Sequence, residues 1–184
     1  MKKIIVLEGP SGVGKDTIIK ELVRQHPDKY IKMPSTTSRA IRLNESQGDP
    51  YFFITKQEFE QKIKNGDVFE YTKTLRDDAY KGMSKKIIND ILASGKIQIK
   101  DCDWVGIEAL RREYGDKVLA IYVHVPKDEV EKRIRARGGC EQDMQRRIAD
   151  YDDYVKIRDW CDVVVENSDL NKCVSDVHRI ISQS

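Results

Sequence analysis

The feature that most constrains this chain is the glycine-rich segment 9–17, Gly-Pro-Ser-Gly-Val-Gly-Lys-Asp-Thr. Residues 3–7 before it form an apolar run that predicts a buried strand, and residues 18–24 after it predict a helix that ends near Pro27. A G-x-x-x-x-G-K match between a strand and a helix indicates a loop that binds phosphate. Its glycines allow backbone N–H groups to point toward an anion, and the N-terminus of the helix adds a partial positive charge.

Lys15 is the residue of this loop that we expect to reach the outer phosphates of a bound nucleotide. It is followed by Asp16, where the pattern prefers Ser or Thr as a hydroxyl ligand for Mg²⁺. A carboxylate also binds Mg²⁺, but it places negative charge beside the phosphates. Thr17 has the hydroxyl, yet one residue further along a helix a side chain points about 100° away. Asp16 is therefore either a metal ligand or an acid favoured in the first turn of a helix.

Length and composition indicate a soluble globular protein. A chain of 184 residues can form one well-cored domain with inserted subdomains. Its net charge of +2 does not suggest a general nucleic-acid binder, and no apolar run approaches the roughly 20 residues of a membrane span. The four cysteines contain no C-x-x-C pair, so we expect reduced, mostly packing thiols in a cytoplasmic protein. These cysteines are Cys102, Cys140, Cys161 and Cys173.

Apolar runs alternate with helical patterns along the chain, which is typical of an α/β protein with a mainly parallel sheet. The predicted strands cover residues 3–7, 30–33, 51–54, 68–75 (one or two strands), 96–101, 118–125 and 162–166. The predicted helices cover residues 18–24, 56–65, 84–94, 105–114, 127–137, 141–158 and the chain from 170 onward. Thr55 and Glu58 fit a capping box at one helix start. The polar stretch 34–83 interrupts the alternation and predicts an inserted subdomain.

Residues in the inserted region suggest how a phosphorylated acceptor is bound. Arg39 and Arg42, followed by Tyr51, can surround a phosphate because the planar guanidinium matches phosphate oxygens. The alternative is a solvated basic loop. Glu70, at the end of an apolar pair, can accept two hydrogen bonds from an edge such as the N1–H and 2-amino group of guanine. The alternative is an exposed acid at a strand end.

Two further groups of charged residues follow later in the chain. Asp101 and Asp103 stand at the carboxyl end of a predicted parallel strand, where α/β proteins bind ligands. They can hold Mg²⁺, a base edge or an arginine, or Asp103 can simply cap the next helix. Several arginines flank a Gly-Gly break and fit a mobile lid that brings positive charge to a phosphoryl group, or the solvated faces of two helices. These are Arg133, Arg135, Arg137, Arg146 and Arg147.

Together these motifs resemble the guanylate kinase family, over almost the whole chain. The segment 9–15 resembles that family's phosphate loop, and residues 35–51 match its Ser-rich, Arg-x-x-Arg, Gly-x-x-Tyr pattern. Glu70 falls where the family's guanine-reading glutamate stands. Residues 101–106 resemble its Asp-x-Asp-x-Gln-Gly turn, and residues 164–170 resemble the segment beside the adenine. Arg137 and Arg147 match its lid arginines.

The resemblance implies an α/β P-loop kinase fold with a five-stranded parallel core sheet, an inserted monophosphate-binding subdomain and a lid. The single domain 1–184 would then consist of a core (1–32, 84–125 and 151–184), the subdomain (33–83) and the lid (126–150). The implied activity is transfer of the ATP γ-phosphoryl group to GMP or dGMP with Mg²⁺. The resemblance gives no oligomeric state.

The resemblance also implies roles for individual residues. The catalytic residues would be Lys15, Arg137 and Arg147. ATP would contact Gly9, Pro10, Ser11, Gly12, Val13, Gly14, Lys15, Asp16, Thr17, Arg133 and Asn167. GMP would contact Ser35, Arg39, Arg42, Tyr51, Glu70, Lys81, Asp101 and Asp103. The candidate ligands for Mg²⁺ are Asp16 and Asp101.

The chain departs from the family pattern in places. Asp16 replaces the loop hydroxyl, and the family's Tyr-Gly-Thr stretch, which touches phosphate and base, is Lys81-Gly82-Met83 here. Either Lys81 replaces the tyrosine as a phosphate contact, or Tyr80 points inward. Met83 cannot donate to a guanine oxygen, and one lost buried hydrogen bond would cost about 1–3 kcal/mol of selectivity.

Two other functions fit parts of the sequence. Ribose 1,5-bisphosphate kinases look similar and also favour Asp after the loop lysine, whereas Glu70 and the Ser-Thr-Thr run at 35–37 serve a purine base. Guanylate-kinase-like peptide-binding domains of scaffold proteins lose the phosphate loop and lid arginines, which this chain keeps. GMP or dGMP is therefore the preferred acceptor.

Overall fold

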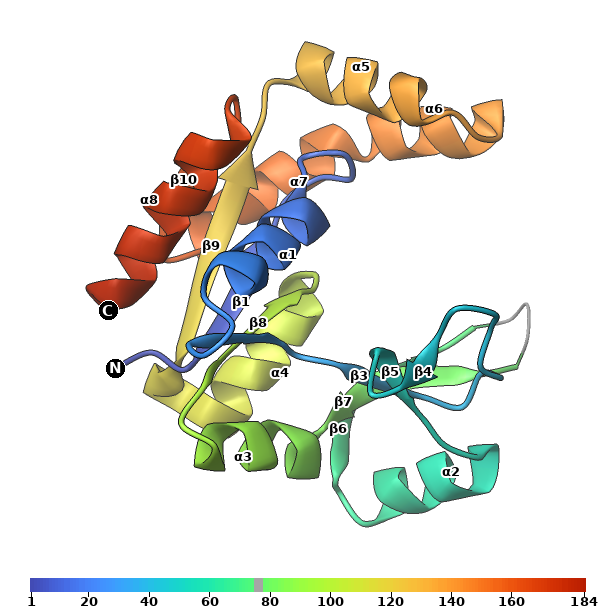
Figure 1. Ribbon diagram of the computed structural model, residues 1–184. Coiled ribbons are helices and arrows are strands. Elements are labelled where there is room, and N and C mark those ends of the chain that lie inside the picture. Colours follow the sequence, from blue (N-terminus) through green and yellow to red (C-terminus); the bar gives the residue numbers. More distant parts are fainter. Residues whose placement is uncertain (75–77) are drawn as a thin grey trace.

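The computed structural model describes residues 1–74 and 78–184, which are organised around two separate sheets (Figure 1). The larger sheet contains five parallel strands in the order β10-β9-β1-β8-β2, which confirms the predicted five-stranded parallel core. Its strands are β1 (Ile4–Glu8), β2 (Tyr30–Lys32), β8 (Ile97–Asp101), β9 (Val118–His124) and β10 (Val163–Glu166).

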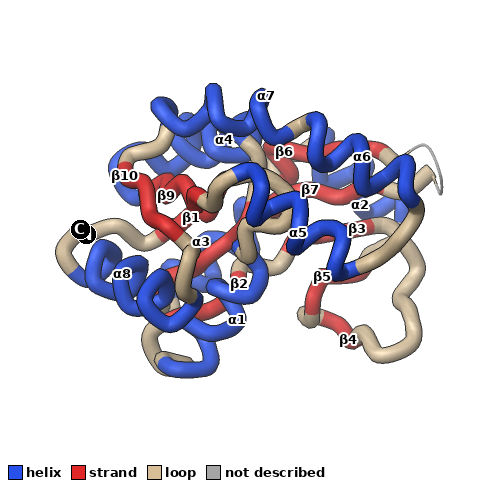
Figure 2. Tube along the Cα trace, turned by 90° about the horizontal axis from the view of Figure 1, so that it is seen from above, coloured by secondary structure: helices blue, strands red, loops and turns tan. Residues whose placement is uncertain are grey.

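Helices cover both faces of this sheet. Figure 2 shows the sheet between α1 and α8 on one side and α4 on the other. The helices are α1 (Lys15–Gln25), α2 (Lys56–Lys64), α3 (Lys85–Ala93), α4 (Trp104–Tyr114), α5 (Lys127–Arg137), α6 (Glu141–Ala149), α7 (Tyr151–Ile157) and α8 (Leu170–Ser182), with short 3₁₀ turns at Gly115–Lys117 and Arg158–Trp160.

The apolar run of β1 is buried on both sides because successive side chains of a strand point to opposite faces. Ile5 and Leu7 pack in a cluster with the apolar residues of α1 and α8. Ile4 and Val6 pack in a second cluster with residues of α3 and α4. All four side chains are fully buried, which explains why this strand has no polar alternation in the sequence.

The inserted region forms a second sheet in the order β4-β5-β3-β7-β6, which lies at the lower right of Figure 1 with α2 against it. Its strands are β3 (Ser35–Thr37), β4 (Ser46–Gln47), β5 (Pro50–Phe53), β6 (Val68–Lys73) and β7 (Tyr80–Ser84). Phe59 of α2 is fully buried and stacks on the ring of Tyr80. The predicted strand 68–75 ends at Lys73 in β6, and Leu75 lies outside the described residues.

The structure corrects two expectations. Residues 34–50 are a polar stretch to which the sequence analysis assigns no strand, yet β3 and β4 lie there, and β3 pairs with both β5 and β7. The side chains of β3 all carry hydroxyl groups, so the sequence shows no apolar pattern there. The strand is recognised only from its pairing with β5 and β7. The single helix predicted for residues 141–158 is also wrong, because α6 ends at Ala149 and α7 begins at Tyr151. The buried Tyr151 hydroxyl donates to the carbonyl oxygen of Val125 at 2.8 Å, which fixes the start of α7.

Helix length and cysteine exposure bear on two further expectations. None of the helices within residues 1–74 and 78–184 is long and apolar enough to cross a membrane. All four cysteines have free thiols. Cys173 is buried, and Cys102 and Cys161 are partly buried, as expected of packing residues. Cys140 is exposed in the turn before α6, so three of the four thiols fit the expectation of mostly packing cysteines.

The predicted capping box at the start of α2 is present. The Thr55 hydroxyl accepts a hydrogen bond from the Glu58 backbone N–H at 3.1 Å, and the Glu58 carboxylate accepts one from the Thr55 N–H at 2.7 Å. Thr55→Ala should lower the free energy of unfolding by about 1 kcal/mol, because it leaves a helix N–H without a partner. Urea denaturation measures this loss. Thr55→Ser keeps the hydroxyl and should lose much less; equal losses in the two variants would contradict the capping role.

Candidate active site

A cavity of about 350 Å³ lies between the two sheets, at the carboxyl ends of the parallel strands β1 and β8. Its volume is in the range of small-molecule pockets, and α/β sheets commonly bind ligands at this edge. The lining residues are Glu8, Gly9, Lys15, Ser35, Glu70, Thr72, Lys81, Gly82, Lys100, Asp101, Cys102, Asp103 and Tyr154. The cavity therefore brings together Lys15 and five of the predicted acceptor residues, Ser35, Glu70, Lys81, Asp101 and Asp103.

The glycine loop between β1 and α1 depends on close backbone contacts. Gly14 has a left-handed φ of 95°, and a Cβ atom there would lie 2.6 Å from the Asn167 side-chain nitrogen. Gly9 has a φ of 138°, and a Cβ atom there would lie 2.6 Å from the carbonyl oxygen of Val123. The Asn167 amide donates to the carbonyl oxygen of Val13 at 2.7 Å. This bond ties the loop to the segment that precedes α8.

Lys15 is the first residue of α1, and its side chain bends back over the loop. Its Nζ donates to the carbonyl oxygen of Pro10 at 3.1 Å and also to that of Gly9. Burial lowers the pKa of Lys15, while the charges of Glu8 and Asp101 oppose the shift. The ammonium group thus lies between the phosphate loop and the acidic wall of the cavity.

Asp16 lies in the first turn of α1 and pairs with two lysines. Lys20 Nζ is 2.8 Å from one carboxylate oxygen, and Lys32 Nζ binds the other. Burial raises the pKa of Asp16, but the hydrogen bonds from both lysines outweigh it and hold the pKa below its usual value. These contacts match the first-turn acid described above, and two ammonium groups already neutralise this carboxylate.

The acids at the base of the cavity lie opposite two lysines. Burial and the nearby charge of Asp103 raise the pKa of Glu70, while the charges of Lys100 and Lys81 oppose the shift. Asp103 Oδ1 accepts a hydrogen bond from the Gly106 N–H at 3.1 Å, so this residue caps α4 as well as lining the cavity. The arrangement offers carboxylate acceptors and ammonium donors to one bound group.

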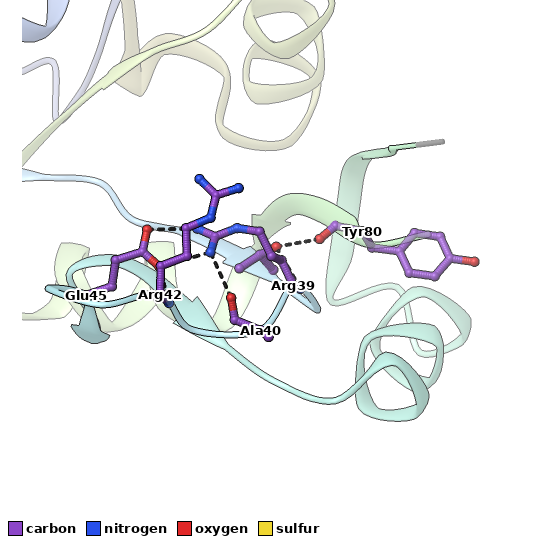
Figure 3. A network of polar contacts seen from close by, with 6 residues as sticks. Arg39, Ala40, Arg42, Glu45 and Tyr80 are labelled. Carbon is purple, nitrogen blue, oxygen red and sulfur yellow. Dashed lines mark hydrogen bonds and ion pairs between the residues drawn. The ribbon is translucent and has the colours of Figure 1, made fainter. Parts of the chain in front are cut away.

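The predicted phosphate residues of the inserted region, Arg39, Arg42 and Tyr51, do not belong to the lining of the cavity. Figure 3 shows the polar contacts around Arg39 and Arg42. Arg39 makes two hydrogen bonds to the Glu45 carboxylate, at 3.0 and 2.9 Å, and its guanidinium lies 5.4 Å from the ring centre of Tyr51. The Arg42 backbone N–H also donates to Glu45, while the Arg42 side chain extends away from this pair (Figure 3). Lys81 Nζ lies 5.3 Å from the same Tyr51 ring, which connects this cluster to the cavity.

The structure decides between Lys81 and Tyr80 as the residue that faces the cavity. Lys81 lines the cavity, whereas the Tyr80 ring stacks on Phe59 with a ring-centre distance of 5.1 Å. The Tyr80 ring also points away from Arg39 in Figure 3. The alternative in which Tyr80 points inward is therefore wrong. Met83 is 1% exposed and packs in the core cluster under α3 and α4.

A second hollow, of about 330 Å³, lies between the phosphate loop, α5 and the start of α8. It brings the expected ATP residues Arg133 and Asn167 next to the loop, and an Arg133 N–H donates to the Asn167 carbonyl oxygen at 3.0 Å. Arg137 lines this hollow and not the cavity between the sheets. Arg147 instead contacts the loop from α6, with its guanidinium 3.2 Å from the Ser11 hydroxyl. The two predicted lid arginines therefore approach the loop from different sides.

Two charged lining residues, Glu8 and Lys100, are not singled out as site candidates by the sequence analysis. Each is a charged residue at or next to the end of a buried strand, and that position is the signal that could have identified them. Glu8 is only 1% exposed, and its Oε2 has no hydrogen-bond partner within the described part of the chain. Burial raises the pKa of Glu8 from 4.5 to about 7, against the effects of the Gly9 N–H and the Lys15 charge.

This shift predicts that stability falls as the pH rises. The folded pKa of Glu8 lies above the unfolded value, so its contribution is complete below about pH 4.5 and is lost as the pH rises through about 7. Wild type should lose roughly 3 kcal/mol between pH 5 and 8 from this group, and Glu8→Gln should not. Urea denaturation across this range measures the difference. Glu166→Gln, at the exposed end of β10, is the control and should follow wild type; a Glu8→Gln curve parallel to wild type would contradict the assignment.

Comparison of the sequence and the fold with known proteins identifies the family of this chain. The guanylate kinase family model matches residues 1–184. A guanylate kinase of Photorhabdus laumondii is 33% identical over 189 residues, covering 97% of this chain and 86% of the relative. A guanylate kinase of Porphyromonas gingivalis is 32% identical over 185 residues, covering 100% and 98%. The crystal structure of guanylate kinase from Anaplasma phagocytophilum has the same fold, with a TM-score of 0.70 at 22% identity over 99% of this chain and 85% of that one. This chain belongs to the guanylate kinase family of nucleoside monophosphate kinases.

Proposed function

We propose that this chain transfers the γ-phosphoryl group of ATP to GMP or dGMP, with the acceptor bound in the cavity between the two sheets. The observation that supports this function most directly is that one cavity unites Lys15 of the phosphate loop with Glu70 and Asp103. The relatives named guanylate kinase match nearly the whole chain. The phosphate loop supplies the donor side of the reaction, and the acids opposite it recognise the acceptor base.

ATP lies along the phosphate loop in this proposal. The backbone of residues 9–14 surrounds its phosphates, Lys15 contacts the outer ones, and the adenosine end enters the hollow beside Arg133 and Asn167. Loop residues whose side chains are buried, such as Val13, contribute through the backbone. Arg137 borders the same hollow and can neutralise charge on the donor phosphates from that side.

The acceptor base lies against Glu70 and Asp103, whose carboxylates accept from the N1–H and 2-amino group of guanine. Its phosphate lies toward Lys81 and the neighbouring cluster of Arg39, Arg42 and Tyr51. In that cluster Glu45 orients Arg39, and Tyr51 lies between Arg39 and Lys81. Residues 33–83 thus act as the monophosphate-binding subdomain.

Phosphoryl transfer depends on positioning of the two substrates and neutralisation of phosphate charge more than on a strong base. Lys15 and Arg147 place positive charge on both sides of the loop, and Arg147 comes from residues 126–150, which we assign as the lid. No group of three or more metal-ligating side chains occurs among the described residues, which fits Mg²⁺ that arrives with ATP and takes one or two protein carboxylates. Asp101, exposed at the cavity wall, is the better placed of the two candidates; Mg²⁺ there would neutralise phosphate charge.

The direct test is ADP formation from Mg-ATP with GMP, dGMP, AMP, CMP, UMP, dTMP and ribose 1,5-bisphosphate as acceptors. We expect rapid turnover with GMP or dGMP only. Lys15→Ala should lower kcat by about 100-fold or more, because it removes the cation from the loop, while Lys172→Ala, at an exposed lysine of α8, should have no effect. Turnover with ribose 1,5-bisphosphate alone would overturn the assigned acceptor.

Glu70→Gln tests the base-recognition site separately. Gln presents an N–H donor where guanine also donates, so we expect the KM for GMP to rise by about tenfold or more. The KM for ATP should stay the same, because Glu70 lies across the cavity from the loop. Steady-state kinetics with each substrate varied in turn give both values. Equal increases in the two KM values would show that Glu70 does not bind the base.

A further inference from the structure

Lys100 is a buried lysine that the sequence motifs do not explain. It is the fourth residue of β8, between Ile99 and Asp101, and is only 8% exposed. Its Nζ donates to the Ser35 hydroxyl at 2.6 Å, which joins the core sheet to β3 of the second sheet. Both residues line the cavity between the sheets, so the ammonium group lies in its wall.

The local environment leaves part of the hydrogen-bonding capacity of Lys100 for a ligand. An ammonium group has three N–H donors, and Ser35 accepts one. No carboxylate of the described residues forms an ion pair with Lys100, and no further hydrogen bond from its Nζ occurs there. Burial lowers the pKa of Lys100, while nearby negative groups, including Asp101 and Glu70, oppose the shift. A buried amine with unused donors is costly, which favours a functional role over a packing role.

The polar groups of the cavity define the edge that a ligand must present. The Glu70 carboxylate accepts hydrogen bonds, whereas Lys100 and Ser35 donate them. A base that satisfies both sides has N–H donors next to a carbonyl oxygen on one edge, as a 2-amino-6-oxopurine does. A 6-aminopurine would place its amino donors against the donors of Lys100 and leave both unsatisfied.

We propose that Lys100 donates a hydrogen bond to the 6-oxo group of the acceptor base and is a specificity-determining residue for 6-oxopurine monophosphates. This inference rests on the proposed GMP kinase activity. It also accounts for Met83, which has no donor: that side chain is buried in the core and does not line the cavity, and the donor comes from the core sheet instead.

The test combines Lys100→Met, which keeps the chain length and removes the donors, with acceptors altered at one position. GMP and IMP both have the 6-oxo group, whereas 6-thio-GMP has a sulfur atom there, which is a poor acceptor. We expect Lys100→Met to lower kcat/KM for GMP and IMP by about 10- to 100-fold and to affect 6-thio-GMP much less. The preference of wild type for GMP over 6-thio-GMP should therefore shrink, with the KM for ATP unchanged.

Controls separate this role from a structural one. Lys86→Met changes an exposed lysine of α3 that pairs with Asp90, and it should retain the wild-type preference. Lys100→Gln keeps an N–H donor and should retain part of the preference; it also replaces Lys100→Met if that variant does not fold, as judged by circular dichroism. If a folded Lys100→Met or Lys100→Gln variant keeps the full wild-type preference for GMP over 6-thio-GMP, the inference about Lys100 is overturned. The proposed GMP kinase activity is not affected by that result. Absence of GMP turnover in wild type would overturn the proposed function as well.

Discussion

The phosphate loop is the constraint on which the rest of the structure depends, because it continues directly from the buried strand β1. All side chains of Ile4–Glu8 are buried, and this strand pairs with β8 on one side and β9 on the other. The loop that follows has little freedom: Gly14 lies against Asn167, and the Asn167 amide holds the Val13 carbonyl. The rigid sheet therefore fixes the position of Lys15 in the lining of the cavity.

The cavity gathers charges of both signs where water is partly excluded, and in such surroundings unpaired charges are costly. Its acids are Glu8, Glu70, Asp101 and Asp103, and its lysines are Lys15, Lys81 and Lys100. The opposite charges limit the effect of burial on the pKa values. Burial lowers the pKa of Lys15, for example, and the neighbouring acids Glu8 and Asp101 raise it. Some donors and acceptors, notably on Lys100 and Glu8, have no partner among the described residues, and a polar ligand can satisfy them.

The two sheets contribute different parts of the site. The core sheet supplies the loop and the charged residues at the ends of β1 and β8, while the second sheet supplies the opposite wall through β3, β6 and β7. The bond between Lys100 and Ser35 joins the two walls directly. The Tyr51 ring is near both Arg39 and Lys81, and the Glu45 carboxylate pairs with Arg39.

The resemblance to the guanylate kinase family implied five strands in the core sheet and acceptor roles for Glu70 and Asp103. The sequence by itself determined the phosphate loop, an α/β fold with a mainly parallel sheet, and most helices. These features follow from local patterns: a glycine spacing, continuous apolar strands, and capping residues next to helical stretches. Only the tertiary structure decided that Lys81 and not Tyr80 faces the cavity, that Asp16 pairs with two lysines, and that β3 is a strand. The physical reason is that these outcomes depend on partners far away in the chain. The burial of the charged residues Glu8 and Lys100 likewise depends on the packing of distant parts of the chain, which no local pattern records.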